Sequence, residues 1–139
     1  MIYKNTNDWD DLEKFENVGA RISTPLITIN LAFTFTLSTS FIRENSDIFK
    51  NNTHVFLSYS RQKSAIVFQF TDEATSHGAI KMTRRSNISI AARSFFNYYS
   101  LDIEKVKGRY EPTLEKIPGK GNCWVIYLNK NLSMKQIKQ

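Results

Sequence analysis

Apolar and polar residues alternate in short runs along most of this chain, and such alternation is typical of β-strands with one buried face. The clearest case covers residues 55–70. Every second residue from Val55 to Tyr59 and from Ile66 to Phe70 is apolar, and the residues between these runs, 61–64, are polar. We therefore predict a β-hairpin whose turn is formed by Arg61-Gln62-Lys63-Ser64.

Further strands are predicted on both sides of this hairpin. Residues 26–29 and 33–35 have the composition of two short strands, and residues 88–90 repeat the alternation. Residues 109–114 and 123–128 are predicted to form a second hairpin. The segment 118–121 between them, Pro-Gly-Lys-Gly, is typical of a turn.

Three helices are predicted from the spacing of apolar residues. The strongest signal is the spacing of Ala92, Phe95, Phe96 and Tyr99, which places all four on one helical face. A second helix is predicted from about Ser38 to Phe49. A third, short helix is predicted within residues 1–20, where apolar residues recur at intervals of three.

The pattern of residues 33–41 recurs, in a similar form, in residues 88–96, and each copy is followed by a predicted hairpin. We therefore expect one α+β domain built from two similar strand–helix–hairpin units, forming a small antiparallel barrel or curved sheets. The expected parts are an N-terminal helix (1–20), a first unit (21–72), a second unit (79–128) and a basic tail (129–139). A chance likeness between two short stretches rich in Phe, Ile and Ser remains the alternative.

The order strand, strand, helix, strand, strand resembles that of the AbrB/MraZ-type swapped-hairpin barrels, in which two such units interlock. The resemblance covers residues 26–128 and is one of pattern. Residues 36–38 and 91–93 stand where that family has a Pro and an Arg, at the turn into the helix. The resemblance implies a DNA-binding role.

Charge is distributed unevenly along the chain. Residues 1–20 contain five acidic side chains and two lysines, whereas the remainder contains 17 basic and 8 acidic residues. A net positive surface attracts polyanions such as nucleic acids. No apolar run approaches the roughly 20 residues of a membrane-spanning helix, and the single Cys excludes an internal disulfide. We therefore expect a cytoplasmic protein with no membrane partner.

Signatures of catalysis are largely missing from the sequence, so we expect a protein that is not an enzyme and has no metal, cofactor or catalytic residue. The exception is a set of carboxylates. Asp72, Glu73 and Glu111 would have to meet in space to hold the Mg²⁺ ions of a metal-dependent nuclease. The alternative is that all three are solvated loop residues.

The richest basic segment runs from residue 81 to residue 109. We predict that it binds DNA or RNA phosphates without catalysis, because Arg forks onto phosphate oxygens and Ser or Asn adds hydrogen bonds. The candidate residues are Lys81, Arg84, Arg85, Ser86, Asn87, Arg93 and Arg109. Two alternatives stay open: a solvated basic surface, and a protein-interaction module or accessory subunit, including a homodimer.

Overall fold

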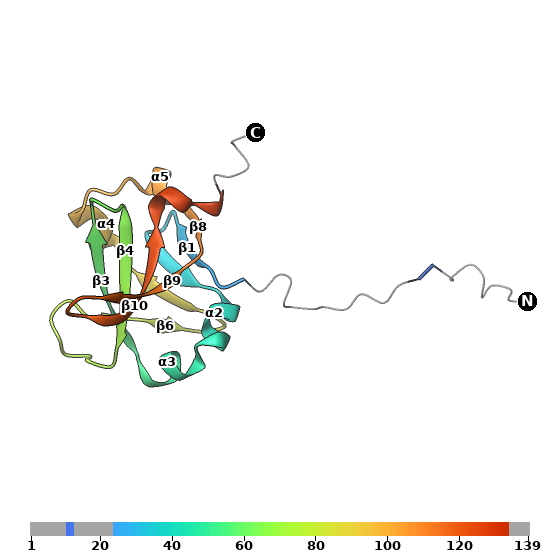
Figure 1. Ribbon diagram of the computed structural model, residues 1–139, viewed down its shortest axis with the longest axis horizontal. Helices are drawn as coiled ribbons and strands as arrows, with labels where there is room; N and C mark the ends of the chain where they lie inside the picture. Colours follow the sequence, from blue (N-terminus) through green and yellow to red (C-terminus); the bar gives the residue numbers. More distant parts are fainter. Residues whose placement is uncertain (1–10, 13–23, 134–139) are drawn as a thin grey trace, which may run out of the picture.

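The computed structural model describes residues 11–12 and 24–133. In this part of the chain, ten β-strands form two five-stranded antiparallel sheets, and short helices lie at the ends of the sheets (Figure 1). The described fold is therefore α+β, as the sequence predicted. Its strands form two separate sheets and not one closed barrel. The predicted helix within residues 1–20 lies outside the described residues, apart from Asp11 and Leu12.

Sheet A has the strand order β6-β7-β2-β1-β8. Its strands are Thr83–Arg84 (β6), Ile88–Ala91 (β7), Thr34–Leu37 (β2), Ile27–Asn30 (β1) and Gly108–Tyr110 (β8). Sheet B has the order β5-β3-β4-β10-β9. Its strands are Ile80–Lys81 (β5), His54–Ser60 (β3), Ala65–Thr71 (β4), Gly121–Tyr127 (β10) and Thr113–Ile117 (β9). The hairpin predicted over residues 55–70 is thus confirmed, with its turn at residues 61–64.

The helices are short and lie at opposite ends of the sheets, with α2 and α3 at one end and α4 and α5 at the other (Figure 1). Their bounds are Thr39–Glu44 (α2), Ser46–Asn51 (α3), Arg93–Tyr98 (α4) and Ile103–Val106 (α5), and a 3₁₀ turn, η2, covers Leu128–Lys130. None of the described helices has the length and apolar character needed to cross a bilayer. The single helix predicted over residues 38–49 is divided at Asn45, whose side chain donates to the carbonyl of Phe41.

The core fills the space between the two sheets. Phe35 of β2 is fully buried. Its ring meets the Phe68 ring of β4 edge-on, with 4.9 Å between the ring centroids, and stacks on the Phe96 ring of α4, with 5.2 Å between the centroids. One side chain therefore joins sheet A, sheet B and a helix. The helical face predicted from Ala92, Phe95, Phe96 and Tyr99 packs into this core, because its spacing places those side chains on one side of α4.

The turn between β1 and β2 places Phe33 differently from the sequence prediction. Phe33 was expected to begin a strand, but its φ is +61° and its N–H donates to the carbonyl of Asn30. A bulky residue rarely adopts this left-handed conformation. The ring of Phe33 packs edge-on against the ring of Phe96, with 6.0 Å between the ring centroids. This packing offsets the backbone strain.

The chain passes between the sheets at two corners. Met82 separates β5 of sheet B from β6 of sheet A, and Glu111-Pro112 separates β8 of sheet A from β9 of sheet B. The continuous strand predicted over residues 109–114 is therefore wrong. Pro112 lacks the N–H that a further ladder bond would need, so pairing ends there and resumes in the other sheet.

Candidate functional site

A basic hollow of about 460 Å³ lies at the corner where β5 of sheet B continues into β6 of sheet A. We define it by the residues that line it, which are Thr53, Lys81, Met82, Thr83 and Arg84. Two cations and two threonines thus share one concave surface, and the Thr53 hydroxyl also lies 2.7 Å from Nδ1 of His54. No carboxylate lines it, so the positive charge of the basic hollow is not neutralised from within.

Strand pairing brings these residues together from distant parts of the sequence. His54 of β3 lies opposite Lys81 of β5, and the N–H of Met82 donates to the carbonyl of Thr53 at 3.0 Å. The Met82 side chain is 3% exposed and anchors the corner in the core. Lys81 and Thr83, on either side of it, are exposed, because successive side chains of an extended chain point in opposite directions.

Arg84 is held in place by the end of α3. It lies opposite Ile88 of β7, and its guanidinium donates a hydrogen bond to the carbonyl of Asn52, the residue that caps α3. A guanidinium has five N–H donors, so this bond orients the group and leaves donors available for an anion. Arg84 is otherwise exposed.

The loop after β6 continues the predicted site. Arg85 donates its backbone N–H to the carbonyl of Asn87 at 2.8 Å, which makes a tight connection into β7. Arg85 and Ser86 are exposed, and Asn87 is partly buried. Lys81, Arg84, Arg85, Ser86 and Asn87 therefore lie on one continuous stretch of chain at the α3 end of the molecule.

The structure places the other two predicted residues elsewhere. The guanidinium of Arg93 lies 4.3 Å from the centre of the Phe33 ring, at the end of the molecule where α4 lies. Arg109 lies on β8, and Arg84 lies on β6, so the two residues are on opposite edges of sheet A. Four inter-strand spacings separate these edges, a distance of roughly 19 Å. The seven candidates therefore do not form a single cradle.

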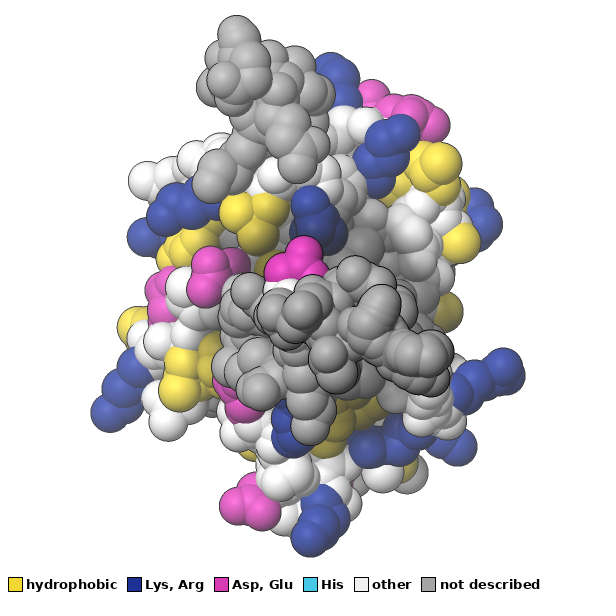
Figure 2. Space-filling model, turned by 90° about the vertical axis from the view of Figure 1, so that its right-hand side faces the viewer, with side chains coloured by type: hydrophobic (Ala, Val, Ile, Leu, Met, Phe, Trp, Pro, Cys, Tyr) yellow, Lys and Arg dark blue, Asp and Glu magenta, His cyan; other side chains and the backbone are white. Residues whose placement is uncertain are grey.

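Carboxylates neutralise few of the cations. Among residues 24–133, the one lysine or arginine in an ion pair is Lys107, whose Nζ lies 3.2 Å from Glu104. On the face drawn in Figure 2, Lys and Arg side chains are scattered, most of them toward the edges, and form no single patch. The basic hollow therefore differs from the other exposed cations in its shape, because it combines two cations in one concave surface.

The carboxylates considered for a nuclease are exposed. Asp72 and Glu73 follow β4, and Glu111 lies at the β8–β9 corner. In the part of the chain that the structure describes, no three His, Cys, Asp or Glu side chains are grouped so that they could hold a metal ion. Cys123 is buried, and this burial raises the pKa of its thiol even though Lys120 lowers it. A raised thiol pKa disfavours the nucleophilic thiolate.

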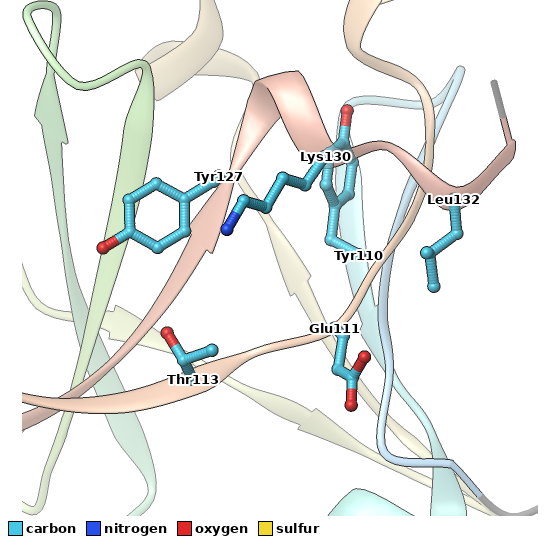
Figure 3. Close-up of a pocket in the computed structure, with 6 residues that line it drawn as sticks. All are labelled: Tyr110, Glu111, Thr113, Tyr127, Lys130 and Leu132. Carbon is cyan, nitrogen blue, oxygen red and sulfur yellow. The ribbon is translucent and has the colours of Figure 1, made fainter. Parts of the chain in front are cut away.

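A second hollow, of about 190 Å³, lies beside the β8–β9 corner. Its lining consists of Tyr110, Glu111, Thr113, Tyr127, Lys130 and Leu132. Figure 3 shows the Lys130 side chain extended toward the Tyr127 ring, with Glu111 pointing away from both. One ammonium and one carboxylate give this hollow no net charge, so it is a poorer anion site than the basic hollow.

Two residues of the basic hollow region were missed by the sequence analysis. Neither Asn52 nor Thr53 was assigned a functional role there, because nothing in the sequence links them to residues 81–84. The link is the pairing of β3 with β5, which is a tertiary contact between short strands. No protein-family model, curated protein or solved structure matches this chain.

Proposed function

We propose that this protein binds nucleic acid without catalysing a reaction on it, and that the basic hollow holds backbone phosphates. The observation that carries this proposal is that Lys81 and Arg84 line one hollow together with Thr83, and that no carboxylate lines it. A phosphate accepts hydrogen bonds from ammonium, guanidinium and hydroxyl groups. The adjacent loop adds Arg85, Ser86 and Asn87 for a neighbouring phosphate.

Salt dependence provides the test. Each cation–phosphate contact releases a counterion, so affinity for mixed DNA or RNA should fall steeply between about 50 and 200 mM salt. Replacing Lys81→Gln and Arg84→Gln together should lower the affinity and reduce the slope of log K against log salt by about 2.

The matched control removes the same charge at the opposite end of the molecule. Lys63 lies in the β3–β4 turn and Lys105 in α5, and both are exposed. The variant with Lys63→Gln and Lys105→Gln should keep the wild-type salt slope. Equal losses in the two double variants would mean that only net charge matters, and an absence of retardation at about 50 mM salt would contradict nucleic-acid binding.

We further propose that the two halves of the domain are related units of the swapped-hairpin kind. Phe35 lies opposite Ile90 in sheet A, and Phe68 lies opposite Trp124 in sheet B. The first pair is 55 residues apart, which is the spacing of the repeated pattern, and the second is 56 apart. If two similar units are related by a two-fold axis, equivalent residues near that axis lie opposite each other. The two corners that link the sheets support a barrel-like arrangement.

A further inference from the structure

A third hollow meets the basic hollow at the end of α3, where Asn52 lines one and Thr53 the other. It measures about 290 Å³, and we call it the indole hollow. Its lining residues are Ile48, Asn52, Phe70, Leu114, Asn122 and Trp124. Four of these six side chains are apolar or aromatic. Sites for small ligands have this composition, in which a few polar groups lie in an apolar surface.

Trp124 in this hollow carries a hydrogen-bond donor that is not used. Its indole Nε1 is buried, and among the described residues it has no acceptor. Buried donors in folded proteins are nearly always paired, because leaving one unpaired costs about 1–3 kcal/mol. Because the Nε1 atom has almost no accessible surface, a ligand in the hollow would contact the ring of Trp124 and not this N–H.

The polar side chains of the hollow include a second unused group. Asn52 donates its side-chain Nδ2 to the carbonyl of Ile48 at 2.9 Å, and an amide has both a donor and an acceptor. This bond fixes the amide and leaves its oxygen to accept a bond from a ligand. Asn122 is exposed at the rim. Leu114, also at the rim, is 55% exposed.

Asn52 and the adjacent Thr53 connect the two hollows. Asn52 lines the indole hollow and its carbonyl accepts the bond from Arg84, while Thr53 lines the basic hollow. The two hollows are therefore lined by neighbouring residues, and one extended ligand could occupy both. A nucleotide fits this pair of hollows, because the flat face of its base stacks on aromatic rings and its amino or ring N–H groups can donate to the Asn52 oxygen.

We propose that the indole hollow receives the base of an unpaired nucleotide whose phosphate occupies the basic hollow. This inference rests on the proposed function and specifies its ligand, which is single-stranded nucleic acid or a nucleotide out of its stack. A base in a duplex is paired and stacked, and it has to leave the stack to enter a hollow. Exposed Leu114 and Asn122 form the entrance through which the base reaches Trp124.

Two oligonucleotides with the same number of phosphates test this proposal. One is a mixed-sequence single strand, and the other is an abasic strand of the same length. The chain has two tryptophans, so the Trp9→Phe protein reports the emission of Trp124 alone. The mixed strand should bind roughly tenfold more tightly than the abasic strand. The mixed strand, and not the abasic strand, should quench Trp124.

Variants at the rim separate base binding from folding. Leu114→Ser combined with Asn122→Ala should reduce the preference for the mixed strand at least about fivefold and leave abasic binding unchanged. The matched control is Leu31→Ser, since Leu31 is 52% exposed in the β1–β2 turn.

The outcomes distinguish the two proposals. Equal affinity for the two strands, with unchanged Trp124 emission, would overturn the base site and leave phosphate binding intact. Loss of affinity for both strands in the Lys81→Gln, Arg84→Gln variant, together with a retained preference for the mixed strand, supports both proposals. If neither strand binds at about 50 mM salt, nucleic-acid binding fails, and the base site fails with it.

Discussion

The side chain of Asn131 occupies the space that a Cβ atom on Gly108 would need. Asn131 is 6% exposed, donates to the carbonyl of Lys107 at 2.8 Å and accepts from the N–H of Ser133 at 2.9 Å. These bonds fasten the segment after β10 to the start of β8. Gly108 has φ of +145°, so both its backbone conformation and its contact with Asn131 favour glycine.

Gly108→Ala should therefore destabilise the fold by roughly 2–4 kcal/mol, because it adds backbone strain and displaces Asn131 from its hydrogen bonds. Urea unfolding measures this loss. Gly78→Ala is the matched control, since Gly78 also has a positive φ, of +90°, but open space around it. It should cost only about 1 kcal/mol of strain. Equal losses at both glycines would show that the contact with Asn131 contributes nothing.

Phe35→Ala should destabilise the fold by about 3–5 kcal/mol, because the ring fills the space between the two sheets and α4. Small domains are stable by about 5–15 kcal/mol, so this variant should lie close to global unfolding. Urea unfolding monitored by circular dichroism measures the loss. Tyr98→Ala is the surface control. Tyr98 is 80% exposed, and its truncation should change stability by less than about 0.5 kcal/mol.

Tyr110 should make stability depend on pH in the alkaline range. Its hydroxyl donates to the carbonyl of Val106 at 2.6 Å, and burial raises its pKa to about 12, although a hydrogen bond with Asn131 lowers it. A tyrosine in the unfolded chain has a pKa near 10. Below about pH 10, both states keep the proton. Between about pH 10 and 12, the unfolded chain loses it first, so the free energy of unfolding falls with rising pH.

The measurement is urea unfolding at several alkaline pH values, compared between the wild type and Tyr110→Phe. The wild type should lose up to about 2 kcal/mol more than the variant across this range. Phe has no proton to release, so the difference isolates Tyr110 from other groups that titrate there. Parallel pH profiles in the two proteins would contradict the raised pKa.

Glu115 and Tyr127 form a coupled pair on neighbouring strands of sheet B. The Tyr127 hydroxyl donates to the Glu115 carboxylate, and this bond, with a smaller contribution from Thr113, lowers the pKa of Glu115. The same bond raises the pKa of Tyr127. Tyr127→Phe should therefore return the pKa of Glu115 toward its ordinary value. Titration followed by carboxyl ¹³C NMR measures the change, and Tyr98→Phe should leave the pKa of Glu115 as it is.

The sequence predicted the local elements better than their arrangement. Alternation identified β3 and β4, and helical spacing identified α4, because both patterns report which face of an element is buried. Phe33 and Pro112 departed from prediction where tertiary packing or a missing N–H overrode the local pattern. The candidate site was likewise predicted only as far as local sequence determines it. Lys81 to Asn87 lie together because they are sequential, whereas the placement of Arg93 and Arg109 depends on strand order, which no local pattern reports.

This arrangement leads to a prediction about the arginines themselves. Arg84 lines the basic hollow, and Arg109 lies on the opposite edge of sheet A. Both are exposed arginines, so Arg84→Gln and Arg109→Gln remove the same charge. If phosphates bind in the basic hollow, Arg84→Gln should reduce the salt slope by about 1. Arg109→Gln should leave the slope unchanged.

Fluorescence anisotropy with a labelled single strand at several salt concentrations measures both slopes. Arg84→Lys serves as a further control, because lysine keeps the charge but lacks the planar fork that bonds to Asn52 and to phosphate together. It should retain the wild-type slope and lose part of the affinity. A reduced slope in Arg109→Gln of the same size as in Arg84→Gln would show that nucleic acid crosses the outer face of sheet A instead, where Arg109 lies opposite Thr28 of β1.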